Sequence, residues 1–133
     1  MKVAELMQPN VRTISGEAYI ADAVLSLADA HISGLPVVDQ AGRIIGVISA
    51  TDVLAAEAEG ETESIGRDLL AETTVRDIMT PRPYTVTPDE DVREAARQML
   101  YADVHRLFVA DGGRLIGVIS TTDIVRGVAT GKL

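Results

Sequence analysis

The chain of 133 residues has room for one domain of ordinary size, or for two half-domains that share a core. Its hydrophobic content of 47% with only 3% aromatic residues predicts an aliphatic core and excludes a disordered chain. The net charge of −8 disfavours nucleic acid and anionic membranes as partners, and the absence of cysteine excludes disulfides, thiol catalysis and thiolate metal sites.

The sequence lacks features that would place it in or across a membrane. It contains no apolar run near the length of about 20 residues that a membrane-spanning helix needs. Its first residues, Met-Lys-Val-Ala-Glu-Leu, lack the long apolar stretch of a secretory signal. We therefore expect a cytoplasmic protein with no membrane partner.

The first half of the chain predicts a strand, a helix, a hairpin and a second helix. Residues 2–7 are short and amphipathic, and residues 11–15 read as a short strand. Apolar residues from Ile20 to Ile32 recur at helical spacing. Two apolar runs separated by a turn predict a hairpin over 35–49, and a further helix follows over 51–59.

The second half repeats this pattern. Residues 3–39 align with 75–111, and residues 46–52 align with 117–123. In the second copy, apolar residues from Val92 to Val104 recur at the same helical spacing, and another helix is expected over 122–129. Two similar units in one small chain suggest that neither buries its apolar face alone, so we expect them to pack on each other. The expected domains are 1–59 and 75–133, joined by an acidic connector over 60–74.

The start of the second copy's helix carries a capping signal. Thr87-Pro88-Asp89-Glu90 reads as an N-cap residue, a proline at the first helical position and an acidic pair that completes a capping box. We therefore expect this helix to begin directly after Thr87.

A Gly-Val-Ile-Ser-x-Thr-Asp motif stands in each copy where a strand should run into a helix. Free backbone N–H groups at such a helix start favour an anion, and the hydroxyls add donors. An ionised aspartate only accepts hydrogen bonds, which suits the vicinal hydroxyls of a ribose. The motif therefore indicates a nucleotide site, while helix capping by the same residues is an equally common explanation. The residues concerned are Ser49, Thr51 and Asp52 in the first copy and Ser120, Thr122 and Asp123 in the second.

Two adjacent cations stand at the entry to the second hairpin. His105 and Arg106 are able to hold phosphate, the arginine through a bidentate fork. The first copy has uncharged Ser33-Gly34 there, so we expect phosphate to bind the two copies unequally. A surface pair in which Arg106 neutralises Asp103 is the alternative. Thr13 and Thr85 are polar residues on the first strands, and from the residues alone half-buried strand threonines are the preferred explanation.

Signals for catalysis or metal binding are missing from the sequence. It has no His/Cys cluster for zinc, no acidic loop for calcium, no phosphate-binding glycine loop and no nucleophile elbow. His105 is the sole candidate for a general base near phosphate. We therefore do not expect an enzyme.

Together these motifs resemble a tandem CBS-domain (cystathionine β-synthase domain) pair. The resemblance lies in the helix, hairpin and Gly-Val-Ile-Ser-x-x-Asp ending of each copy and in Met7-x-Pro9 and Met79-Thr80-Pro81. It also includes Leu35-Pro36-Val37-Val38-Asp39 and His105-Arg106-Leu107-Phe108-Val109. It implies an α/β fold (α+β-like), in which two β-α-β-β-α units pack through their sheets with pseudo-two-fold symmetry.

The resemblance also implies a function and roles for the site residues. Members of this family bind adenine nucleotides or adenosyl compounds in clefts between their units, regulate a partner and commonly dimerise. By this likeness, Asp123 would accept from ribose, Ser120 and Thr122 would lie near phosphate, and His105 and Arg106 would hold it. Thr13 would line the adenine end of the same cleft. The second cleft would use Ser49, Thr51, Asp52 and Thr85.

We expect a free-standing regulatory module that senses AMP, ADP, ATP, NAD or S-adenosylmethionine, with no catalytic cofactor, and signals in trans to a partner protein. We also expect a homodimer. In this reading Asp123→Ala weakens nucleotide binding more than Asp52→Ala, because only the second copy carries the cation pair. A structural or dimerisation module without a physiological ligand is the alternative, and nucleotide hydrolysis dependent on His105 is the third hypothesis.

Overall fold

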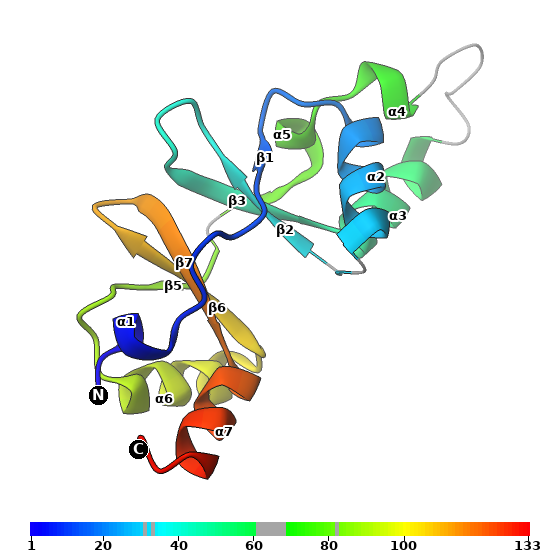
Figure 1. Ribbon diagram of the computed structural model, residues 1–133. Coiled ribbons are helices and arrows are strands. Elements are labelled where there is room, and N and C mark those ends of the chain that lie inside the picture. The colour runs from blue at the N-terminus through cyan, green and yellow to red at the C-terminus, as the bar shows by residue number, and fades with distance from the viewer. Residues whose placement is uncertain (31, 33, 61–68, 82) are drawn as a thin grey trace. The chain divides into compact units, whose positions relative to one another are not determined.

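The computed structural model describes residues 1–30, 32, 34–60, 69–81 and 83–133 (Figure 1). It divides into two compact units: unit 1 comprises Met1–Val11 and Tyr84–Leu133, and unit 2 comprises Arg12–Pro83. These units do not coincide with the repeats along the sequence. The start of the first repeat belongs to the unit built from the second repeat, and the start of the second repeat belongs to the unit built from the first.

Unit 1 is a three-stranded sheet with helices. Strand β5 runs parallel to β6, which forms an antiparallel hairpin with β7. Helices α6 and α7 contact each other and lie together in Figure 1, and α1 packs against α7. The elements of unit 1 are α1 (Val3–Leu6), β5 (Thr85–Val86), α6 (Val92–Ala102), β6 (Arg106–Asp111), β7 (Arg114–Ser120) and α7 (Thr121–Ala129).

Unit 2 repeats this plan and adds a fourth strand. Its sheet order is β1-β2-β3-β4, with β1 parallel to β2 and the other pairs antiparallel. The elements of unit 2 are β1 (Ile14–Ser15), α2 (Ile20–Ala30), β2 (Gly34–Val38), β3 (Ile44–Ser49), α3 (Ala50–Gly60), α4 (Leu69–Glu72), α5 (Val75–Ile78) and β4 (Thr80–Pro81). The order strand, helix, strand, strand, helix is thus confirmed in both copies, as is the mixed α/β class.

One predicted helix start is wrong. The N-cap of α6 is Asp91, whose carboxylate accepts from the backbone N–H of Arg93 at 2.8 Å, not Thr87. Thr87 instead opens a turn, in which its carbonyl accepts from the N–H of Glu90 at 3.3 Å. Thr87 and Asp91 are both short polar residues of the kind that favour turns and helix caps, so the sequence alone does not separate the two roles.

Each unit contains a short segment from the start of the other repeat, residues 1–11 in unit 1 and residues 75–81 in unit 2. Each of these exchanged segments contributes a valine to the core of the unit that contains it. In unit 1, Val3 is fully buried against residues of the sheet and α6, including Leu107 and Ile119. In unit 2, Val75 is fully buried in the matching place, beside Leu35 and Ile48. A buried valine stabilises a fold by roughly 1.5–3 kcal/mol, so these short segments are integral parts of the units that they join.

A glycine in each hairpin permits the exchanged segment to approach. A Cβ on Gly117 would lie 2.8 Å from Met7 Sδ and 2.9 Å from the carbonyl oxygen of Gln8. The corresponding Cβ on Gly46 would lie 2.6 Å from Met79 Sδ and 2.8 Å from the carbonyl oxygen of Thr80. The glycine of the repeated motif therefore serves the packing of the Met-x-Pro segment against the last hairpin strand.

Some predicted features lie outside the described residues. Ser33, which precedes Gly34, is among them, as are residues 61–68 of the acidic connector. Within the described part of the connector, residues 69–72 form α4. None of the helices described is long and apolar enough to cross a membrane.

Candidate functional site

The repeated Ser-x-x-Asp motif forms a capping box at α7. Ser120 is the N-cap residue, and its hydroxyl oxygen accepts from the backbone N–H of Asp123 at 3.2 Å. In return, Oδ2 of Asp123 accepts from the backbone N–H of Ser120 at 2.8 Å and from its hydroxyl at 2.9 Å. Asp123 is buried, with 5% of its surface exposed.

Unit 2 builds the same arrangement at α3. Oδ2 of Asp52 accepts from the backbone N–H and the hydroxyl of Ser49 at 2.9 and 3.0 Å, and the N–H of Asp52 donates to the Ser49 hydroxyl at 3.2 Å. The capping explanation is thus confirmed in both units. In each aspartate, capping uses only Oδ2. Ligand binding through Oδ1 stays a prediction.

The other carboxylate oxygen is held by a residue that sequence reasoning missed. Gln8 Nε2 donates to Oδ1 of Asp123 at 3.0 Å, and Thr80 Oγ1 donates to Oδ1 of Asp52 at 2.9 Å. Gln8 and Thr80 occupy the same place between the Met and Pro of the repeated Met-x-Pro motif. The recurrence of the Met-x-Pro motif was a signal that its middle residue is functional. The contact of that residue with the aspartate was not predictable, because it depends on which unit the Met-x-Pro segment joins.

The predicted cation pair lies beside the capping box of unit 1. Arg106 is paired directly with Ser120 in the β6–β7 register, which places their side chains on one face of the sheet. The backbone N–H of Thr121 donates to the carbonyl of His105 at 2.9 Å. The structure therefore brings His105, Arg106 and Ser120 together at the N-terminus of the nine-residue α7.

Both cations are exposed, and within the described part of the chain neither forms an ion pair. Asp103, the proposed partner of Arg106, is instead the left-handed C-cap residue of α6. In unit 2 the residue paired with Ser49 is Gly34. The difference in charge that the sequence indicates is therefore present at equivalent places in the two hairpins.

The four predicted threonines are exposed. Thr122 and Thr51 lie in the first turns of α7 and α3, Thr85 begins β5 opposite Phe108, and Thr13 immediately precedes β1. Thr85 thus belongs to unit 1 with Asp123, and Thr13 belongs to unit 2 with Asp52. The partnerships predicted from the resemblance join Thr13 with Asp123 and Thr85 with Asp52, and they stay predictions.

A cavity of about 230 Å³ adjoins the capping box of unit 1. Its lining includes Gln8, Asp123 and Arg126, and an Arg126 Nη atom lies 3.3 Å from Oδ1 of Asp123. Glu5, Thr130 and Lys132 are its other polar lining residues. Asp123 is therefore the buried polar group at this cavity, and the cations around it are on α7 and the chain end.

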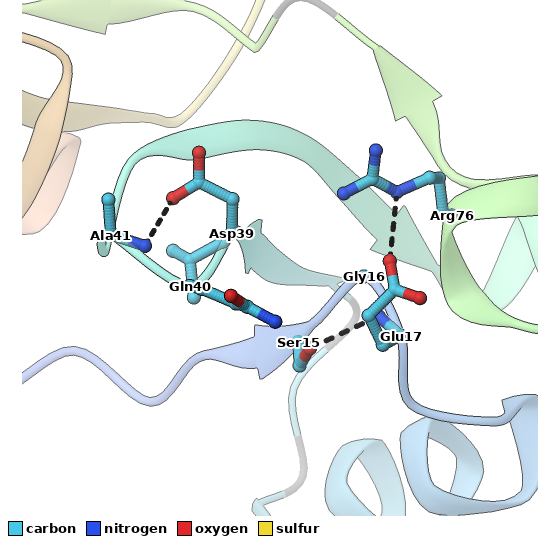
Figure 2. Close-up of a pocket in the computed structure, with 8 residues that line it drawn as sticks. Ser15, Gly16, Glu17, Asp39, Gln40, Ala41 and Arg76 are labelled. Atoms are coloured by element: carbon cyan, nitrogen blue, oxygen red, sulfur yellow. Dashed lines mark hydrogen bonds and ion pairs between the residues drawn. The ribbon is translucent and has the colours of Figure 1, made fainter.

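Unit 2 has an open pocket of about 370 Å³ away from its capping box. In Figure 2, Arg76 points toward Glu17, and the two lie 3.5 Å apart, while the turn at Asp39–Ala41 forms another part of the wall. Asp39 accepts from the backbone N–H groups of Arg43 and Ala41, both at 2.9 Å. The polar groups here serve the turn and the ion pair, and none of the predicted site residues lines this pocket.

The N–H group of Arg43 is the main reason that the pKa of Asp39 is lowered from its ordinary value of 3.8. Among the described residues, no group of three or more His, Cys, Asp or Glu side chains is placed to hold a metal ion. The chemistry of the capping-box sites is therefore that of hydroxyl and N–H donors, exposed cations in unit 1 and carboxylate acceptors.

Known proteins share this architecture. The chain is 29% identical over 93% of its length to the chloroplastic CBS domain-containing protein CBSX2 of Arabidopsis thaliana, of which it covers 62%. A structure of CBSX2 in complex with AMP matches 99% of this chain and 98% of that chain, with a TM-score of 0.82 and 30% identity.

Two further relatives extend this comparison. The CBS domain pair of protein MJ0100, in complex with 5′-methylthioadenosine and S-adenosyl-L-methionine, covers 95% of this chain and 98% of that chain, with a TM-score of 0.73 and 26% identity. The gamma subunit of 5′-AMP-activated protein kinase of Saccharomyces cerevisiae is 27% identical over 96% of this chain, which covers 40% of that subunit.

The chain spans between 32% and 62% of the length of the first three curated relatives that it matches. The family model of the CBS domain matches the chain twice, over residues 3–59 and 75–130. These two ranges fall on the two copies of the repeat, including both Met-x-Pro segments and both capping boxes. The chain belongs to the CBS-domain family and consists of a tandem pair of these domains.

Proposed function

We propose that this chain is a regulatory module that binds adenine nucleotides or other adenosyl compounds. The observation that carries the proposal is the pairing of Arg106 with Ser120 at the N-terminus of α7, with Asp123 in the same first turn. A guanidinium at the N-terminus of a helix suits a phosphate, and a carboxylate beside it suits the sugar hydroxyls.

Within this proposal each predicted residue has a chemical role. His105 and Arg106 hold phosphate, and Ser120 and Thr122 lie near it. Asp123 accepts from the ribose. In unit 2, Ser49, Thr51 and Asp52 perform the matching roles without a cation at Gly34. Thr13 and Thr85 line the adenine ends.

The solved complexes of related CBS pairs support this class of ligand. CBSX2 was solved with AMP, and the MJ0100 pair with 5′-methylthioadenosine and S-adenosyl-L-methionine. All three ligands share an adenosine portion and differ in charge. We therefore propose the adenosyl group as the shared recognition element and AMP, ADP, ATP, NAD or S-adenosylmethionine as the candidate ligands, in a regulatory and not a catalytic role.

A thermal-shift series with these five compounds tests the proposal. A ligand that binds only the folded chain, present at 100 times its Kd, stabilises it by about 2.7 kcal/mol. We expect at least one compound to raise the Tm and calorimetry to confirm saturable binding. A flat response to all five at millimolar concentration would contradict the proposal and favour the alternative of a structural or dimerisation module.

We also propose a homodimer, because apolar side chains stand exposed on the helices of both units. In unit 1, Leu100 and Tyr101 of α6 are 83% and 93% exposed, and Val125 and Val128 of α7 are also exposed. Leu54 of α3 is 69% exposed in unit 2. Such surface indicates a protein interface. Leu100→Glu should shift the mass measured by light scattering toward the monomer, whereas Leu133→Glu at the chain end should not.

The regulated target would be a separate protein, to which the module signals in trans by population shift between ligand-bound and ligand-free packings. The cytoplasmic location stays a prediction. Hydrolysis is disfavoured as a function because His105 is exposed and, among the described side chains, no hydrogen bond orients its imidazole.

A further inference from the structure

The two capping-box aspartates differ in how many hydrogen bonds they already accept. A carboxylate has about four lone-pair positions. Asp123 accepts four bonds: two from Ser120, one from Gln8 and one from Arg126. Asp52 accepts three from described residues: two from Ser49 and one from Thr80.

One residue accounts for this difference. Arg126 lies one helical turn after Asp123, with its Nη1 atom 3.3 Å from Oδ1. The equivalent residue after Asp52 is Ala55, whose methyl group cannot donate. The Gln8 and Thr80 bonds are matched between the units, as are the serine bonds, so among the described residues Arg126 is the donor without a counterpart in unit 2.

We propose that Arg126 lowers the affinity of the unit 1 site for a sugar hydroxyl, and that the unit 2 site, with Ala55 in its place, has the better sugar acceptor. This inference rests on the proposed function, because it requires the aspartates to face the ligand. A hydroxyl that donates to Oδ1 of Asp123 must displace the arginine, whereas Oδ1 of Asp52 accepts only one bond, from Thr80, among the residues that the structure describes.

The displacement is physically feasible. The Arg126 side chain is 60% exposed, while that of Asp123 is only 6% exposed. Arg126 also lines the 230 Å³ cavity, which leaves open space beside it. The guanidinium is largely solvated and its contact with Asp123 is long, so we expect competition from Arg126 to reduce the affinity by a modest factor of about 1.5 to 5, as for a weak ion pair.

The inference changes the expected order of the two sites for uncharged ligands. For AMP, Arg106 favours the unit 1 site through phosphate. For adenosine, which has no phosphate, the unit 2 site should be the tighter one. The two sites would then divide ligands by charge: unit 1 would favour phosphorylated compounds, and unit 2 would favour uncharged adenosyl compounds.

Reciprocal substitutions test the inference. Arg126→Ala should tighten adenosine binding at one site by about 1.5- to 5-fold, and Ala55→Arg should weaken it at the other by a similar factor. Adenosine is used because it isolates sugar recognition from the loss of a cation near phosphate. Arg97→Ala is the matched control, because Arg97 forms an exposed ion pair with Glu94 at 2.8 Å on α6 and has the same charge.

A second measurement needs no nucleotide. Carbodiimide coupling of carboxyl groups to an amine, followed by peptide mass spectrometry, reports which aspartates are covered. In the unsubstituted chain Asp52 should react faster than Asp123. Arg126→Ala should accelerate Asp123, Ala55→Arg should slow Asp52, and Arg97→Ala should alter neither rate.

The outcomes distinguish a failure of this inference from a failure of the proposed function. If Arg126→Ala and Ala55→Arg both leave the adenosine affinities unchanged while the chain still binds nucleotides, this inference is overturned and the proposed function stands. Carboxyl reactivities that ignore them would overturn it as well. If no variant binds any adenosyl compound, the proposed function fails, and the role of Arg126 toward a sugar fails with it.

Discussion

Unit 1 and unit 2 are alike where the fold requires it and different where a ligand would be recognised. Both have a glycine that admits the Met-x-Pro segment, a serine–aspartate capping box and a buried valine from the exchanged segment. They differ at Arg106 against Gly34 and at Arg126 against Ala55. Packing therefore constrains both copies equally, while the charged residues that could bind or compete with a ligand are free to diverge.

The largest expected effect tests the likeness of the two units. Gly117→Ala and Gly46→Ala each place a methyl group within 3 Å of a backbone carbonyl oxygen of the exchanged segment. Overpacking of this kind costs about 1–3 kcal/mol in the free energy of unfolding, measured by urea denaturation. Gly34→Ala is the control, because its Cβ would meet neighbours at an ordinary 3.5 Å. If either variant has the same urea midpoint as the unsubstituted chain, the two glycines do not have equivalent packing roles in the two units.

A second prediction tests the exchange of segments. Val3→Ala should destabilise unit 1, and Val75→Ala should destabilise unit 2, each by about 2 kcal/mol, because both side chains are fully buried. Hydrogen exchange resolved by residue should place the loss in the unit that contains the segment. A loss confined to the copy from which Val3 comes in sequence would contradict the described units. Leu25→Ala, at a side chain that is 63% exposed, provides the baseline.

A third prediction concerns the charge difference. Arg106→Ala should weaken AMP binding by about 10- to 150-fold, since a hydrogen bond to a charged group contributes about 1.5–3 kcal/mol. Adenosine binding should stay unchanged. Gly34→Arg should make AMP bind more tightly in unit 2, to a smaller extent. Calorimetric titrations that show the same loss for AMP and adenosine would mean that Arg106 supports the fold and not the phosphate.

The smallest expected effect is the response to acid. The backbone N–H of Arg43 lowers the pKa of Asp39 in unit 2, and that of Arg93 lowers the pKa of Asp91 in unit 1, each from an ordinary value of 3.8. A lowered pKa in the folded chain stabilises it above the ordinary value, and this contribution disappears as the pH falls through the folded value. The Tm should therefore fall below about pH 4, and less steeply in Asp39→Asn. Identical acid profiles would contradict this.

Much of the fold was predictable from periodicity and repetition. The helical spacing from Ile20 and from Val92 predicted α2 and α6, and the paired apolar runs predicted both hairpins. The start of α6 was not predictable, because Thr87 and Asp91 both have side chains that cap or turn a backbone. The exchange of segments also escaped prediction, since a repeat in sequence does not say which hairpin Val3 packs on.

The residue types of the candidate site were predictable from the sequence, but some of the hydrogen bonds and ion pairs between them were not. The motif identified Ser120, Asp123 and Arg106 by residue type, and the strand register brings Arg106 opposite Ser120. Gln8 and Arg126 were missed. Gln8 reaches Asp123 through the exchanged segment, and a lone arginine on a helix surface is usually solvated. Contacts that depend on tertiary placement leave no local pattern in the sequence.

Calorimetric titration of the whole chain with AMP and with adenosine tests the central claim most directly, because it measures adenosyl binding and the inequality of the two sites together. We predict two binding steps of unequal affinity. Arg106→Ala should weaken only the tighter AMP step, and Arg126→Ala should tighten one adenosine step. No binding of either compound, or two identical steps that neither substitution alters, would contradict the account.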